Sequence, residues 1–146
     1  MAVKLKVPSP VARTEYYAKP ASTAFAIDSL VAPNKDNTSN TFVAATSSTT
    51  VNLGVLQKAV ASTDSDYASE TKVPVLVDEL GIWEFDVGTG SADINDEQGY
   101  IDLTDAVGVN VTASTVDAVF VVNYVSATKV QGKIVRWAGL EPPAIV

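Results

Sequence analysis

Residues 119–137, Val-Phe-Val-Val-Asn-Tyr-Val-Ser-Ala-Thr-Lys-Val-Gln-Gly-Lys-Ile-Val-Arg-Trp, decide the fold class of this 146-residue chain. Apolar, β-branched residues are frequent at both ends of the stretch, and Ser126-Ala-Thr-Lys129 separates the two groups. Side chains branched at Cβ pack well on a pleated strand surface. The stretch therefore predicts two strands joined by a short turn, the first covered on both faces. Gly132 within the second strand indicates a bulge or a close approach of another backbone.

The pattern of the hairpin extends through most of the chain. Trp83, Phe85 and Val87 alternate with Glu84 and Asp86, as in a strand with one face inside and one outside. Further strands are expected in residues 24–31, 42–45, 51–56, 73–77, 101–104 and 107–112. Eight or nine short strands at this spacing predict an all-β fold, either a compact β-sandwich or a small β-barrel.

The first 20 residues differ from the rest in composition. Pro8, Pro10 and Pro20 disfavour a helix or a central strand there. We therefore expect an extended basic N-terminal arm at residues 1–20, a β domain at 21–138 and a Pro-containing tail at 139–146. Aromatic side chains on such an arm are typical anchors for another subunit. The candidate contact residues are Lys4, Lys6, Arg13, Tyr16 and Tyr17 of the arm, together with Trp137 before the tail.

Composition narrows the classes of function. The chain has no histidine and no cysteine, so the commonest general base, the commonest metal ligand and the thiolate nucleophile are missing. A formal charge of −7 disfavours binding to nucleic acid phosphates. No apolar run approaches the length of a membrane span or of a signal-peptide core, which predicts synthesis in the cytoplasm and no membrane partner.

The remaining chemical candidates are weak. Residues 93–99 begin like a calcium loop, but Gln98 and Thr104 occupy the positions that need Gly and Glu, so a solvated acidic turn is favoured. Carboxylates that could pair as in a glycosidase, or a serine–lysine pair at Ser126 and Lys129, have simpler interpretations as exposed strand and turn residues. The carboxylates concerned are Glu79, Glu84, Asp86 and Asp102. We expect no catalytic residue, no cofactor and no metal site, and hence no enzyme.

Several short motifs occur in an order that is familiar from one family. They are Asp64-Ser-Asp-Tyr67, Lys72-Val-Pro-Val75, Ile82-Trp-Glu-Phe85, Gly99-Tyr-Ile-Asp-Leu103, Val109-Asn-Val-Thr-Ala-Ser114 and Ser126-Ala-Thr-Lys-Val-Gln-Gly-Lys-Ile134. Across residues 20–136 the chain resembles the decoration, or cement, proteins of tailed-bacteriophage heads. The resemblance implies a β-rich virion protein on the outer capsid surface, made in the host cytoplasm. It also implies that the protein binds and stabilises the lattice of the major capsid protein, and that it is a homo-oligomer with a trimer favoured.

Two other classes of function are compatible with the residues. A carbohydrate-binding or adhesin-like β module on a particle surface would use Trp83, Trp137 or Tyr100 as a stacking platform. A small hydrolase would need a carboxylate or lysine with a strongly shifted pKa, and it ranks last. Trp83, Trp137 and Phe120 are otherwise expected in the core, with Trp137 the one placed where a subunit contact is natural.

Overall fold

The computed structural model of the protein describes residues 1–34 and 40–139. Eleven strands and one 3-10 turn form in this part of the chain, and the expected all-β class is confirmed. The elements are β1 (Val3–Val7), β2 (Arg13–Ala18), β3 (Leu30–Pro33), β4 (Phe42–Ala44), β5 (Gly54–Leu56), β6 (Lys72–Val77), β7 (Ile82–Thr89), η1 (Ile94–Asp96), β8 (Tyr100–Asp105), β9 (Gly108–Asn110), β10 (Val119–Ser126) and β11 (Lys129–Ile134).

The C-terminal half of the chain forms a small closed barrel. Its strands follow the order β7-β11-β10-β8-β9, and β9 returns to pair in parallel with the second half of β7. Strand β1 pairs with the first half of β7, on the same edge of β7 with which β9 pairs in the second half. A closed ring of strands leaves few unpaired backbone groups, and β1 occupies part of the remaining edge.

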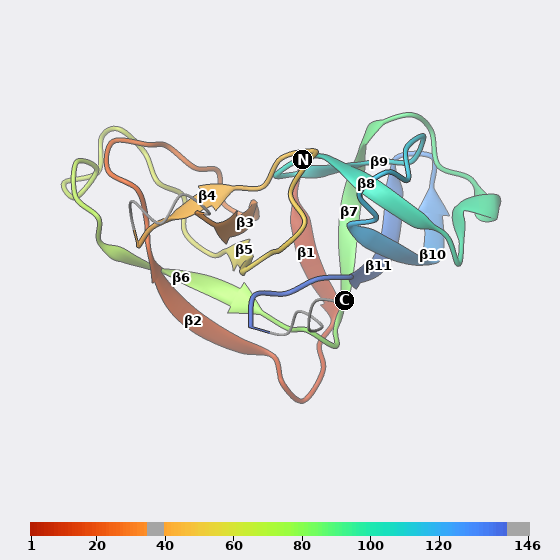
Figure 1. Ribbon diagram of the computed structural model, residues 1–146, viewed down its shortest axis with the longest axis horizontal. Coiled ribbons are helices and arrows are strands. Elements are labelled where there is room, and N and C mark those ends of the chain that lie inside the picture. The colour runs from red at the N-terminus through yellow and green to blue at the C-terminus, as the bar shows by residue number, and fades with distance from the viewer. Residues whose placement is uncertain (35–39, 140–146) are drawn as a thin grey trace, which may run out of the picture.

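The second sheet has the order β2-β6-β5-β3-β4, and all its neighbouring strands are antiparallel. It lies beside the barrel, on the side where β1 pairs with β7 (Figure 1). The Leu30 N–H donates to the Ala106 carbonyl at 2.7 Å, and the Asn52 N–H donates to the Arg136 carbonyl at 3.2 Å. These bonds tie the second sheet to the barrel at two points.

One buried apolar cluster runs through both sheets. It contains Val31, Val55 and Val75 of the second sheet as well as Trp83 and Phe85 of the barrel strand β7. Burying apolar side chains stabilises a fold by about 25 cal/mol per Å² removed from water. Because this cluster is shared, the described residues form one folding unit.

The N-terminal region corrects the expected domain boundaries. Residues 3–7 and 13–18 are strands β1 and β2 of the two sheets, so residues 1–20 are part of the β domain and not an arm outside it. Pro8 and Pro10 lie in the connection between these strands and Pro20 follows β2, where proline removes no ladder hydrogen bond. The two extra strands also raise the strand number above the expected eight or nine. Within the expected tail, residues 140–146 lie outside the described residues.

The hairpin of residues 119–137 is confirmed as β10, a short turn and β11. Its first strand has fully buried residues only in its first half: Val119 and Val121 are buried, whereas Asn123 and Val125 in the second half are exposed. The prediction that both faces are covered throughout was therefore wrong. Gly132 is a close-approach position, because a Cβ atom there would overlap the carbonyl oxygen of Phe120. The strand expected in residues 24–31 begins only at Leu30, and the segment before it makes a single bridge between Phe25 and Val60.

Candidate functional site

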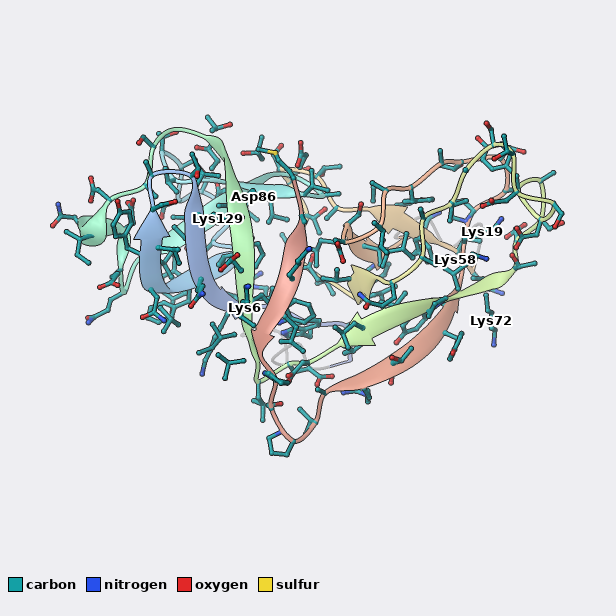
Figure 2. The ribbon with its side chains drawn as sticks, turned by 180° about the vertical axis from the view of Figure 1, so that it is seen from behind. Lys6, Lys19, Lys58, Lys72, Asp86 and Lys129 are labelled. Carbon is teal, nitrogen blue, oxygen red and sulfur yellow. The ribbon has the colours of Figure 1, made fainter. Side chains whose placement is uncertain are left out.

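A lysine-lined face covers the outside of β1, β7 and β11. Lys4 and Lys6 project from β1, Glu84 and Asp86 from β7, and Lys129 from β11, around a hollow of about 380 Å³. These side chains share a face because the strand register sets Lys4 opposite Glu84 and Lys129 opposite Asp86. Figure 2 shows Lys6, Asp86 and Lys129 on this side of the molecule.

Ion pairs hold the side chains of the lysine-lined face in place. The ammonium of Lys129 lies 2.9 Å from Asp86 and 3.7 Å from Glu84, and that of Lys6 lies 3.9 Å from Glu84. Burial raises the pKa of Asp86, but the hydrogen bonds from Lys129 and from the Ala2 N–H outweigh it, so the pKa is lowered overall. The bond to Asp86 raises the pKa of Lys129. The face is therefore charged and ordered at neutral pH.

The expected contact residues of the N-terminal region divide between this face and β2. Arg13 donates to both carboxylate oxygens of Glu79, at 2.9 and 2.6 Å, and to Glu15 at 2.9 Å. Tyr17 donates its hydroxyl hydrogen to Glu15. Tyr16 points away from this network and is 62% exposed. Strand β2 thus carries an ordered ionic row on one face and a free tyrosine on the other.

The pKa values in this row follow from its hydrogen bonds. The bonds from Tyr17 and then from Arg13 lower the pKa of Glu15, and the bond from Arg13 lowers that of Glu79. Burial, followed by the bond to Glu15, raises the pKa of Tyr17 to about 12. The carboxylates are held ionised and the phenol neutral, which fixes the geometry of the row.

Trp137 is not a surface contact in this chain. It is 4% exposed, its indole packs 6.0 Å from that of Trp83, and its Nε1–H donates to the Ile134 carbonyl. Trp83 is fully buried, with its Nε1–H on the Asp78 carbonyl. Neither tryptophan can therefore stack on a carbohydrate. Of the three platform candidates, Tyr100 remains half-exposed, beside Phe120 at 5.2 Å.

The acidic turn expected at residues 93–99 has a structural role. Asp93 caps η1 by accepting from the Asn95 N–H at 2.7 Å, and Asp96 accepts from the Asp93 N–H at 2.8 Å. This reciprocal pair is a capping box. In residues 1–34 and 40–139, no three histidine, cysteine or carboxylate side chains come together as a metal site would require.

The other chemical candidates are separated or already engaged. Asp102 is buried and accepts from the N–H groups of Thr115, Val116 and Asp117, whereas Glu79 lies across the molecule on Arg13. Lys129 binds Asp86 and Glu84, while Ser126 contacts Thr128. Glu84 and Asp86 share the hollow of the lysine-lined face, where both pair with Lys129, but the four carboxylates do not converge on one cleft. The serine–lysine pair is not formed.

Lys19 is the residue that sequence reasoning missed. Its side chain is buried, and its ammonium donates to the carbonyls of Asp66 at 2.7 Å, Ser69 at 2.5 Å and Tyr67 at 3.4 Å. Nothing in the local sequence distinguishes Lys19 from the exposed Lys58 and Lys72, which lie in the same part of the molecule (Figure 2). The carbonyls come from a loop about fifty residues away, so only the fold brings them together.

Comparisons of the chain with protein-family models, curated proteins and solved structures find no match. Among the described residues, no helix is both long enough and apolar enough to cross a membrane.

Proposed function

We propose that this chain is a structural virion protein that binds the exterior of a phage capsid and stabilises the lattice of the major capsid protein. The proposal rests on the resemblance of residues 20–136 to phage head decoration proteins, and it assigns the protein no catalytic role and no cofactor. The structural observation that carries it is the ordered lysine-lined face. Side chains already held in ion pairs lose little conformational entropy when a partner covers them.

The lysine-lined face is where we expect the capsid to bind. It lies on strands, which move less than loops, and it presents cations on a protein that is acidic as a whole. An acidic patch on the major capsid protein would complement it. Many copies bound to one lattice would add avidity without strong single contacts.

Co-sedimentation tests the proposal. Purified protein is mixed with capsids that lack it, and the bound fraction and the capsid melting temperature are measured. We expect saturable binding that weakens with salt and raises the melting temperature of the capsid. The variant Lys129→Glu should bind less, while Lys72→Glu, on the second sheet, should bind as the original does. Deleting residues 1–20 is not a usable test, because it removes β1 and β2. Failure of the unmodified protein to bind capsids would refute the function.

A carbohydrate-binding module displayed on a particle surface is the second candidate. The half-exposed Tyr100 beside Phe120 is the observation that favours it, because an exposed aromatic face can stack on a sugar ring. Glycan binding that is lost in Tyr100→Ala, together with no binding to capsids, would favour this candidate over the first.

A further inference from the structure

Among residues 1–34 and 40–139, no strand pairs with the outer edge of β2. The order of the second sheet leaves β2 with β6 as its single neighbour (Figure 1). It runs for six residues with no register shift and contains no proline and no lysine. Such an edge offers a row of unpaired backbone groups to another strand.

The other edge strands in the described part of the chain are protected. Strand β4 spans only three residues. Strand β1 carries Lys4 and Lys6, contains a register shift after Leu5, and donates its Val3 N–H to the Asp28 carbonyl at 2.9 Å. Short length, lysines and bulges are the devices that keep edges from pairing. Strand β2 is longer and has no bulge, and its charged residues Arg13 and Glu15 are paired with each other and Arg13 also with Glu79, which marks this edge as different.

The hydrogen-bond pattern shows which residues of β2 point outward. The Lys19 N–H donates to the Thr71 carbonyl, so Lys19 faces β6. Pro74 lies opposite Tyr16, but its carbonyl accepts from the Gln57 N–H on the far side of β6 and not from β2. Backbone groups of successive residues alternate between the two sides of a strand. The odd-numbered residues of β2 therefore bond to β6, and the N–H and C=O groups of Thr14, Tyr16 and Ala18 point outward.

We propose that two copies of this chain pair through β2, edge to edge and antiparallel, about a two-fold axis at Tyr16. Only the outward residues of one copy can exchange hydrogen bonds with the outward residues of the other. This condition leaves two registers in which most of the two β2 strands overlap. An axis at Glu15 would set two carboxylates directly opposite each other, which is destabilising. An axis at Tyr16 sets Tyr16 opposite its own copy, Thr14 opposite Ala18, and Glu15 opposite Tyr17. The second register is therefore favoured.

The charged neighbours of this edge are compatible with pairing. Arg13 would lie opposite Lys19 of the second copy, but the lysine ammonium is enclosed by three carbonyls and the guanidinium is held by Glu79 and Glu15. The pair of tyrosines at the axis would replace two 62% exposed rings by a cross-strand aromatic contact. The assembly is a two-fold dimer, unlike the trimer that the resemblance implies, and it does not depend on the proposed function.

Charge-swapped variants test the dimer in purified protein, without capsids. Analytical ultracentrifugation should show a dimer for the original chain, and mainly monomers for Tyr16→Asp and for Tyr16→Lys separately, because each sets like charges opposite at the axis. An equimolar mixture of the two variants should recover the dimer. Matched variants Val43→Asp and Val43→Lys change an exposed residue on the other edge strand, β4, and should stay dimeric.

The outcomes decide the proposal. A monomeric original chain at millimolar concentration, dimers of Tyr16→Asp alone, or a mixture that stays monomeric would each overturn it. Should the variants fail to fold, amide hydrogen exchange of the original chain gives the answer. The outward N–H groups of Thr14, Tyr16 and Ala18 should exchange slowly in concentrated solution and quickly on dilution. Exchange that is independent of concentration would also overturn the dimer.

Discussion

Replacing Lys19 by methionine should destabilise the fold more than the same replacement at the exposed Lys58 or Lys72. Methionine keeps an apolar stem of similar length but removes the ammonium that ties the end of β2 to the loop at residues 66–69. Two of the three hydrogen bonds that the Lys19 ammonium donates are short, at 2.7 and 2.5 Å, and the third, to the Tyr67 carbonyl, is 3.4 Å long. The substitution thus removes the lysine donor from three carbonyls. The Asp66 carbonyl keeps the Ser69 N–H at 3.0 Å and the Tyr67 carbonyl keeps the Ser22 N–H at 2.7 Å.

The expected loss follows from these bonds. A hydrogen bond that involves a charged group contributes about 1.5–3 kcal/mol, so the two short bonds together contribute about 3–6 kcal/mol. Methionine no longer buries a charge, which recovers part of that loss. We expect a net decrease in the free energy of unfolding of about 2–4 kcal/mol. For a chain of this size, each kcal/mol lowers Tm by about 2–4 °C, so Tm should fall by roughly 5–15 °C.

Urea and thermal unfolding, followed by circular dichroism, measure this loss. Lys58→Met and Lys72→Met are the matched controls, since both lysines are exposed near the same loop, and each should change stability by less than about 0.5 kcal/mol. If Lys19→Met unfolds at the same temperature and urea concentration as these controls, the ammonium does not hold the loop, and the argument from its hydrogen bonds is wrong.

Three further measurements check the core and β2. Trp83 and Trp137 are buried, so native emission should be blue-shifted and resist quenching by iodide until the protein unfolds; ready quenching of the native state would contradict their burial. Because the pKa of Tyr17 is raised from 10.0 to about 12, its contribution to stability is complete below pH 10 and is lost as pH rises through about 12; ultraviolet titration should show a late step that Tyr17→Phe removes. Gly132→Ala should lower the free energy of unfolding in urea by about 1–3 kcal/mol, because its Cβ overlaps the Phe120 carbonyl, and an unchanged value would refute the close approach.

Alternation of apolar residues predicted the strands whose two faces meet different surroundings. Residues 73–77 and 83–87 lie in β6 and β7, where Val75 and Phe85 are buried between half-buried neighbours. The nearly continuous apolar run at residues 119–125 instead predicted a strand covered on both faces, and this was wrong. Such a run does not distinguish that strand from one that faces solvent along half its length. The class of fold was thus predictable, while the degree of coverage depended on the barrel around it.

The N-terminal strands could not be predicted from their own residues. Prolines argued against central strands, and β1 and β2 are indeed at edges, but the partners that make them strands are residues 82–85 and 72–77, far along the chain. The candidate residues of this region were named as contacts of a free arm. The structure divides them between the lysine-lined face and β2, and it places Trp137 in the core. Sequence reasoning found chemically distinctive residues, but burial and pairing decided what each one contacts.

Three buried charges explain how a chain without disulfides holds its long connections. Lys19 binds the carbonyls of the loop at residues 66–69, Asp78 accepts from the Ser9 and Leu80 N–H groups, and Asp102 accepts from the N–H groups of residues 115–117. Buried backbone groups outside strands need such partners, and a charged side chain can serve several at once. The hydrogen bonds of these three ionisable groups therefore stabilise the fold. The paired charges of the lysine-lined face, by contrast, lie at the surface, where we propose that a capsid binds, and the edge of β2 is where we propose that a second copy pairs.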